Sequence, residues 1–494
     1  MRYVRTVIMT MVAMACLTTN LAAAERPNIL VFLVDDMGVM DTSVPFLTDA
    51  EGQPVKHPLN EYYRTPSMER LAAQGVRFET FYANSVCSPS RATILTGQNS
   101  ARHKITQWIK PDKRNPGPDD WRWSGLDSRD VTLPRVLQQA GYQTIHIGKA
   151  HFGPNEHEGS DPCTLGFDVN VAGCAIGHPG SYLGSQNYGQ GKSHAVPHLE
   201  AYHGSDTFLT EALTLEAIKQ VDAAVAAGKP FFLHMSHYAV HSPFTADERF
   251  IDHYTESEQL PRRSFGTLIE GMDKSLGDLL DHLQQIGQAE QTLVLFVGDN
   301  GSDAPIMGAT KMDDHKWSSA APLRGKKASC YEGGMRVPFI ISWAMPLADN
   351  ALQQKHPVAS GSITIDSFAT IEDIMPTLLA VAEVSAPGDH KMDGINIMPA
   401  LATANASTKR QSFLMHFPHG HRSSDFTSYR EGRWKLIRFY SEKRVELYDL
   451  EADPFERNDL ASEDPARTAT MEAAMQAQLD ACGAQYWNRG KERK

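Results

Sequence analysis

Two pairs of neighbouring polar residues with hard oxygen ligands follow apolar runs of the sequence. The pairs are Asp35–Asp36 and Asp299–Asn300. In an open α/β sheet, ligands bind outside the carboxyl ends of the strands, so two such strand ends would bring these four side chains together. Carboxylate and amide oxygens suit Ca²⁺ or Mg²⁺ better than a soft metal. Either pair alone could be turn residues that cap a strand, but the two together favour a metal site.

The segment 87–97 reads CSPSRATILTG and is the most specific local pattern in the chain. Proline is tolerated in the first turn of a helix and Gly97 can end one, so the segment predicts a short helix with Cys87 at its N-terminus. The helix dipole and Arg91 would create a positive field there, which lowers a thiol pKa and favours anions. The pattern also fits a buried or disulfide-bonded cysteine that precedes a helix.

Apolar runs that alternate with amphipathic stretches predict the elements that position these residues. Strands are expected at 28–34, 143–147, 231–235, 292–297 and 337–341, and helices at 131–140, 208–226, 263–286 and 366–384. This alternation predicts an open, mostly parallel α/β sheet flanked by helices. After about residue 400, short runs joined by a tight turn at 431–432 predict an antiparallel sheet, and 465–481 predicts a closing helix.

The first 24 residues are typical of a secretory signal peptide. Arg2 and Arg5 precede an apolar run, and small residues at 22–24 offer a cleavage site. We therefore expect export to the periplasm or the medium, with an uncleaved anchor or a lipoprotein on Cys16 as the alternative. In an oxidising compartment Cys163 and Cys174 are close enough in sequence to form a disulfide.

Composition excludes several classes of protein. With 494 residues, 41% hydrophobic and 21% charged, the chain is neither disordered nor collagen-like nor a polytopic membrane protein. Its 47 basic and 59 acidic residues give a formal charge of -12, so no general basic surface is available for nucleic acid or an anionic bilayer. An anionic substrate would need a locally positive pocket.

The pattern C-x-P-S-R-x-x-x-L-T-G at 87–97 resembles the signature of the type I (formylglycine-dependent) sulfatases, in the alkaline-phosphatase-like superfamily. Further likenesses to that family are spread over nearly the whole mature chain. They lie at 26–36, 148–151 (GKAH), 239–243, 297–301, 323–334 and 446–454. The resemblance implies an alkaline-phosphatase-like fold with a sulfatase catalytic domain at 25–404 and a small C-terminal α+β subdomain at 405–494.

The resemblance also implies roles for single residues. One calcium ion would be held by Asp35, Asp36, Asp299, Asn300 and residue 87. A formylglycine-generating maturation enzyme would oxidise Cys87 to formylglycine, whose hydrate attacks sulfur with one hydroxyl and expels sulfate with the other.

The remaining catalytic roles implied by the family concern charge and proton transfer. Arg91, Lys149 and Lys327 would offset the substrate's negative charge. His241 would protonate the leaving oxygen, and His151 would take the proton that drives elimination. Lys326-Lys327-Ala328 departs from the family's usual Gly-Lys-Gly, which leaves Lys326 as an alternative to Lys327.

The substrate is less clearly indicated. The segment 416–422 is dense in donors for sugar hydroxyls or a second sulfate, and its candidate contacts are His416, His419, His421 and Arg422. The loop with His178, His194, His198 and His203 has the same potential. Both segments are equally compatible with ordinary polar loops.

An acidic chain without a long basic groove favours a focused pocket. We therefore predict exo-acting desulfation of sulfated oligosaccharides from an algal or other sulfated polysaccharide, with no nucleic acid partner and no membrane insertion after signal cleavage. Alternatives are an aryl sulfatase, a phosphate or phosphonate ester hydrolase, or a catalytically inactive calcium-stabilised sugar-binding protein.

Overall fold

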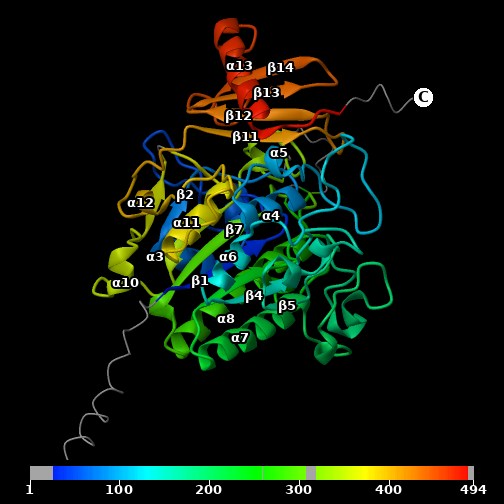
Figure 1. Cartoon of the computed structure of the whole chain (residues 1–494), viewed down its shortest axis with the longest axis vertical. Coiled ribbons are helices and arrows are strands. Elements are labelled where there is room, and N and C mark those ends of the chain that lie inside the picture. The colour runs from blue at the N-terminus through cyan, green and yellow to red at the C-terminus, as the bar shows by residue number, and fades with distance from the viewer. Residues whose placement is uncertain (1–25, 259, 307–318, 366, 488–494) are drawn as a thin grey trace, which may run out of the picture.

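The computed structural model describes residues 26–258, 260–306, 319–365 and 367–487 (Figure 1). The signal peptide expected at 1–24 lies outside these residues. Within them, none of the helices combines the length and the apolar character needed to cross a bilayer.

A mixed sheet of eight strands forms the centre of the molecule. In spatial order its strands are β5 (Val169–Val171), β4 (Gln143–Gly148), β6 (Phe231–Ser236), β1 (Asn28–Val34), β7 (Thr292–Gly298), β8 (Phe339–Trp343), β2 (Val76–Phe78) and β9 (Ser362–Thr364). The pairs from β5 to β7 are parallel, whereas β8 runs antiparallel to β7 and β2. The predicted mostly parallel sheet is confirmed. β8 begins at Phe339, because Pro338 has no N–H to donate to a neighbouring strand.

The central strands are apolar on both faces, and each face is covered by helices. The helices of this part of the chain are α2 (Pro58–Tyr62), α3 (Pro66–Gln74), α4 (Cys87–Thr96), α5 (Ser100–His103), α6 (Leu133–Gln139), α7 (Leu209–Ala226), α8 (Arg263–Gln285), α9 (Glu332–Met335), α10 (Ala351–Lys355), α11 (Ile374–Val381) and α12 (Met398–Leu401), of which only some cover the sheet. Phe32 of β1 packs in one core with α3, α7 and α8, whereas Val31 packs in the other with α4, α6 and α11. Alternate residues of one strand therefore fill two separate cores.

The helix expected at 366–384 is shorter than predicted. A short strand, β10 (Ala369–Thr370), pairs with β3 (Phe81–Tyr82), and a 3₁₀ turn follows before α11 begins at Ile374. The Thr370 N–H donates to Asp373 Oδ2 at 2.8 Å. This capping contact ends the extended segment and starts the helical one.

The C-terminal part forms a second sheet, stacked on the first domain in Figure 1. Its strands β11 (Ser412–Phe417), β12 (Phe426–Glu431), β13 (Trp434–Phe439) and β14 (Arg444–Asp449) form an antiparallel meander, followed by α13 (Pro465–Cys482). Phe413 and Met415 pack toward the main domain, and Leu414 packs under α13. The predicted antiparallel sheet and closing helix are confirmed, and the boundary at 404/405 stays a prediction.

The cysteines of the described residues are all free thiols. Cys163 is exposed and Cys174 is half-buried, with its sulfur 4.0 Å from the Tyr238 hydroxyl. The disulfide considered between Cys163 and Cys174 is therefore not formed in this structure.

Candidate active site

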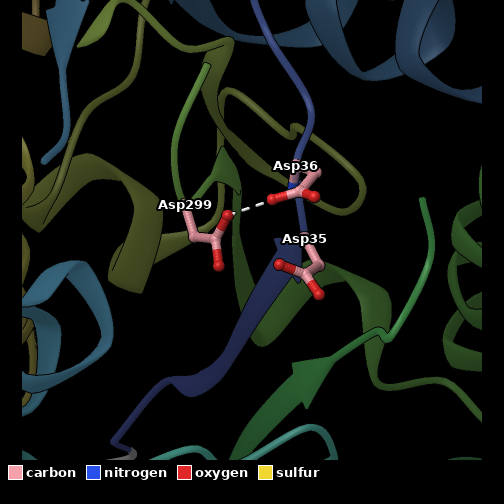
Figure 2. A group of neighbouring side chains, drawn as sticks. All are labelled: Asp35, Asp36 and Asp299. Atoms are coloured by element: carbon pink, nitrogen blue, oxygen red, sulfur yellow. Dashed lines mark hydrogen bonds between the residues drawn. The ribbon is translucent and has the colours of Figure 1, made fainter. Parts of the chain in front are cut away.

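Three aspartates meet at the carboxyl ends of β1 and β7. Oxygens of Asp35, Asp36 and Asp299 lie within 4.8 Å of one another, and all three side chains are buried. The backbone N–H of Asp36, in a left-handed conformation with φ 59°, donates to Asp299 Oδ1 at 3.0 Å (Figure 2). The strands are parallel neighbours, and Val34 is in register with Gly298. This register brings the two predicted pairs together.

A basic side chain pairs with each of these carboxylates. Lys149 Nζ lies 2.7 Å from Asp35 Oδ2, Arg91 is 2.8 Å from Asp299 Oδ2, and Lys327 Nζ is 2.6 Å from Asp36 Oδ1. Lys149 follows β4, Arg91 lies one turn into α4, and Lys327 comes from the loop before α9. Three segments far apart in sequence therefore place three cations around one acidic centre.

The aspartate pKa values differ because their surroundings differ. Burial raises the pKa of Asp35 well above its usual range; the Lys149 ammonium opposes this, while Asp299 and Asp36 add to it. Burial also acts to raise the pKa of Asp36, but the Lys327 ammonium and His241 outweigh it and hold that pKa well below its usual range. The two neighbouring carboxylates therefore have pKa values shifted in opposite directions.

The ligand set fits a hard divalent cation. Asp35 Oδ1 and Asn300 Oδ1 are buried and accept no hydrogen bond. Asn300 Nδ2 donates to Asp36 Oδ1 at 2.9 Å and to the Gly301 carbonyl, so Asn300 Oδ1 takes part in neither of these hydrogen bonds. Unpaired buried oxygens are costly, and an ion coordinated by both would satisfy them. The chemistry of these donors suits Ca²⁺.

Cys87 is the first residue of α4, as predicted, and contacts His151. Its Sγ lies 3.3 Å from His151 Nδ1, and His151 Nε2 lies 2.6 Å from the Ile109 carbonyl oxygen. A carbonyl only accepts, so Nε2 carries the proton and Nδ1 presents a lone pair to residue 87. Burial and the nearby Lys149 lower the pKa of His151 well below its usual range, which keeps the ring neutral. A neutral acceptor at this distance is suited to proton abstraction.

The expected depression of the Cys87 pKa is wrong. Burial raises the pKa of this thiol; Lys149 and Lys327 lower it only in part, and Asp35 and Asp299 raise it further. The helix N-terminus and Arg91 alone would predict the opposite shift, because that reasoning leaves out desolvation. Unmodified Cys87 is therefore a protonated, weakly nucleophilic thiol at neutral pH.

His241 and Lys327 lie on the same side of Asp36. His241 Nε2 is 3.5 Å from Asp36 Oδ2, and the His241 side chain is 17% exposed. Lys326, the alternative lysine, points to Asp303 at 3.5 Å and is 31% exposed. The structure brings Lys327, not Lys326, into the buried cluster.

The four proposed substrate contacts divide into two groups. His416 is buried between Thr427 Oγ1 (2.7 Å) and the Gln485 carbonyl (2.6 Å). His419 is buried with one nitrogen 2.9 Å from Thr106 Oγ1 and the other 3.1 Å from the Pro116 carbonyl. Both ring nitrogens of each histidine are occupied. These two residues hold the loop in place and are not brought to the site.

His421 and Arg422 lie near the acidic centre. Arg422 pairs with Asp303 at 2.8 Å, the same aspartate that faces Lys326. Burial, Arg422 and Lys327 all lower the pKa of His421 to about 4. The next residue, Ser423, donates to the Ala328 carbonyl at 2.8 Å, which joins this loop to the Lys327 segment.

Sequence reasoning missed Trp108 and Lys110. The half-buried Trp108 indole lies 5.7 Å from the His421 ring, and Lys110 Nζ lies 5.4 Å from the indole centroid. Ile109, between them, supplies the carbonyl to His151. These residues belong to a loop without regular periodicity. The only feature of the sequence that could have indicated them was a tryptophan two positions before a lysine, shortly after the 87–97 segment.

Comparison with known proteins agrees with this geometry. The chain shares the fold of its sheet and C-terminal subdomain with solved structures to which it is similar. Residues 27–384 match the model of the family "Sulfatase", and 326–485 match "N-sulphoglucosamine sulphohydrolase, C-terminal". The chain belongs to the sulfatase family, a class of sulfuric ester hydrolases. The family inferred from the 87–97 pattern is confirmed.

The chain is similar to curated proteins and solved structures with several different names. Human N-acetylgalactosamine-6-sulfatase is 30% identical over 404 residues, which are 77% of this chain and 66% of that protein. The chain thus spans about two thirds of that relative. Ps i-CgsB, solved in complex with k-i-k-neocarrahexaose, has a TM-score of 0.72 at 22% identity and covers 95% and 96% of the two chains. The phosphonate monoester hydrolase of Agrobacterium radiobacter has a TM-score of 0.61 at 19% identity, with 92% and 96% covered.

Proposed function

We propose that this protein is a calcium-dependent sulfatase that uses formylglycine made from Cys87 and removes sulfate from the end of short sulfated oligosaccharides. The observation that carries the proposal is the contact between Cys87 Sγ and the acceptor nitrogen of His151, 3.3 Å apart, at the edge of a buried centre with three cations. An unmodified thiol here is a poor nucleophile. The surrounding charges are those needed to bind and cleave an anionic ester.

Arg91, Lys149 and Lys327 would bind and orient the sulfate group. All three are buried, so their charges act in a medium of low dielectric constant where they stabilise an anion strongly. Asp35, Asp36, Asp299 and Asn300 would hold the calcium ion. When bound, that ion would supply positive charge beside the sulfate group and residue 87.

Residue 87 would act after its maturation. The hydrated aldehyde of formylglycine supplies two hydroxyls on one carbon, one to take the sulfuryl group and one to release it. His151 Nδ1, held toward residue 87 by the Ile109 carbonyl, would accept the proton of the second hydroxyl. A serine at this position would lack that second hydroxyl and stay esterified.

His241 would donate a proton to the leaving oxygen. Its position at the mouth, beside Asp36 and partly exposed, is where the alcohol part of a bound ester would lie. A sugar alkoxide is a poor leaving group, so protonation during S–O cleavage matters more for a sugar ester than for an aryl ester.

The substrate proposal is a terminal residue of a sulfated oligosaccharide. His421 and Arg422 line the entrance, and the Trp108 indole offers an apolar face of the kind that sugars stack on. Likenesses to proteins named for N-acetylgalactosamine-6-sulfate or solved with a neocarrahexaose support a sulfated glycan. The formal charge of -12 argues against a long basic groove.

The signal-like residues 1–24 support an exported enzyme, and the family's maturation enzyme would be its transient partner. Cleaved protein purified from the periplasm or medium would support export. N-terminal sequencing that finds Met1 on the purified native protein would contradict it.

The central test combines mass and turnover. The peptide that contains residue 87 should carry an aldehyde in place of the thiol, and the same preparation should release inorganic sulfate from sulfated oligosaccharides. Unmodified Cys87 in natively matured protein, with no sulfate release, would favour the calcium-stabilised sugar-binding alternative.

A second candidate activity is phosphate or phosphonate ester hydrolysis. The fold likeness to a phosphonate monoester hydrolase favours it, since three cations also suit a phosphoryl group. Matched aryl sulfate, aryl phosphate and aryl phosphonate esters distinguish the two. We expect kcat/KM to be highest for the sulfate.

A further inference from the structure

Three imidazole rings stack in a column at the mouth of the site. The His178 ring lies 5.5 Å from the His241 ring, with an interplanar angle of 12°, and 3.9 Å from the His194 ring at the same angle. Both His178 and His194 come from the loop between β5 and α7, and both are half-buried. The His178 ring, with His194 stacked on it, therefore forms a flat support beside His241.

The backbone of this loop is held against the second candidate proton-transfer residue. A Cβ added to Gly177 would lie 2.9 Å from Cε1 of His151, which is closer than real Cβ atoms approach. Only glycine lets the chain pass so near that ring. Gly177 therefore lets the chain pass beside His151 immediately before His178.

Within the part of the chain that the structure describes, the polar contacts of the His241 ring are with Ser242 and Asp36. Nδ1 lies 3.0 Å from the carbonyl and 3.2 Å from the hydroxyl of Ser242, its own neighbour, and Nε2 is 3.5 Å from Asp36. A separation of 3.5 Å is long for a strong hydrogen bond. The broad face of His178 is the aromatic contact that restricts rotation of the His241 ring.

His178 is suited to support a ring that carries a proton. Its Nδ1 donates to the Pro179 carbonyl at 3.1 Å, which fixes its tautomer. Burial, opposed by that backbone hydrogen bond, lowers the pKa of His178, and His194 and Lys149 lower it further. Burial lowers the pKa of His241 well below its usual range and Asp36 opposes this. A neutral His178 adds no positive charge that would lower that pKa further.

We infer that His178 is a positioning residue for the general acid: its ring, backed by His194, holds His241 in the orientation that donates a proton to the leaving oxygen. The inference rests on the proposed function, in which His241 is that acid. His178 itself exchanges no proton with the substrate and contributes through His241.

Leaving-group dependence tests this role. A sugar sulfate needs its leaving oxygen protonated, whereas a nitrophenyl sulfate leaves as a stabilised anion and needs little help. For His178→Ala we expect kcat on the sugar sulfate to fall by about 10² while KM changes little, because misplacing a catalytic group by about 1 Å costs that much. The kcat on nitrophenyl sulfate should be little changed.

Two further variants complete the test. His178→Phe keeps a flat ring and should restore most of the lost kcat on the sugar sulfate. His203→Ala is the matched control, because His203 belongs to the same loop but contacts the Tyr188 ring, 6.1 Å away, rather than His241. That variant should keep the wild-type ratio of kcat on the sugar sulfate to kcat on nitrophenyl sulfate, because it leaves the His241 ring in place.

Several outcomes would overturn the inference. Equal losses on both esters in His178→Ala would indicate damage to the loop or the sulfate site. Failure of His178→Phe to recover activity would mean that the imidazole nitrogens, not the stacked face, matter. If matured wild-type protein hydrolysed neither ester, the proposed function itself would be wrong, and the inference with it.

Discussion

His151 Nδ1 lies 3.3 Å from Cys87 Sγ, while the opposite nitrogen of the same ring is held by the Ile109 carbonyl. The carbonyl fixes the tautomer, and burial keeps the ring neutral. The contact therefore places His151, the proposed base for sulfate release, next to Cys87, the residue that is proposed to become formylglycine.

Replacing His151 should stop the second half of the reaction. In His151→Ala, sulfate release should fall by about 10²–10⁴ in kcat, the range for loss of a general base. Residue 87 should then accumulate in its sulfated form, visible by mass spectrometry after incubation with substrate. Steady-state loss without a sulfated adduct would instead place His151 before sulfuryl transfer.

Removing the nucleophile should abolish activity without unfolding the chain. Cys87→Ala should release no sulfate, yet keep the wild-type circular dichroism spectrum and melting temperature, because the small side chain contributes little packing. Cys87→Ser should also be inactive in a host whose maturation enzyme accepts only cysteine. Retained turnover in Cys87→Ala would exclude the formylglycine mechanism.

Metal removal should lower both activity and stability. Buried carboxylates without their cation repel one another, and a ligand at 100 times its Kd stabilises the folded state by about 2.7 kcal/mol. Chelation should therefore reduce Tm and sulfate release, and added Ca²⁺ should restore both. Asp299→Ala should show the same losses without recovery. Full activity in protein shown to be metal-free would contradict the calcium assignment.

Acid should destabilise the protein through its buried histidines. Burial lowers the pKa of His416 to about 4, from an ordinary value near 6.5. Below pH 6.5 the unfolded chain then binds more protons than the folded one. The contribution of neutral His416 to the free energy of unfolding is therefore fully present above pH 6.5 and is lost as the pH falls toward 4. The titration of His416 alone should lower the free energy of unfolding by about 2 kcal/mol between pH 7 and pH 5.

Denaturant unfolding of wild type and His416→Gln at the two pH values checks this. The variant is less stable overall, but its free energy of unfolding should fall less between pH 7 and pH 5. An unchanged pH dependence would show that His416 is not the titrating group.

The entrance residues should matter for sugars and not for small aryl esters. Trp108→Ala, His421→Ala and Arg422→Ala should each lower kcat/KM on sulfated oligosaccharides by about 10-fold or more, the effect of losing roughly 1.4 kcal/mol of binding. The kcat/KM of these variants on a nitrophenyl sulfate should fall far less. Rates on wild type should not rise with oligosaccharide length. Equal losses on both substrates, or rates that climb with length, would point to a damaged fold or an endo-acting groove.

The strands that carry the site were predictable because their signal is local. The run at 29–34 is apolar at every position, which indicates a strand buried on both faces, as β1 is. Gly97 was likewise readable as a helix end, and it adopts the left-handed conformation, with φ 65°, that ends α4. By contrast, β2, β5 and β9 have three residues each, too few for a period to emerge.

The family, the main sheet and the residue types around positions 35, 87 and 299 could be predicted from the amino-acid sequence, because short motifs and strand periodicity are written in consecutive residues. Which lysine enters the centre, the raised Cys87 pKa and the position of His421 rather than His416 near Lys327 depend on the folded structure. It alone placed His178 on His241. Burial and neighbouring charge depend on segments hundreds of residues apart, and these contacts exist only after the chain has folded.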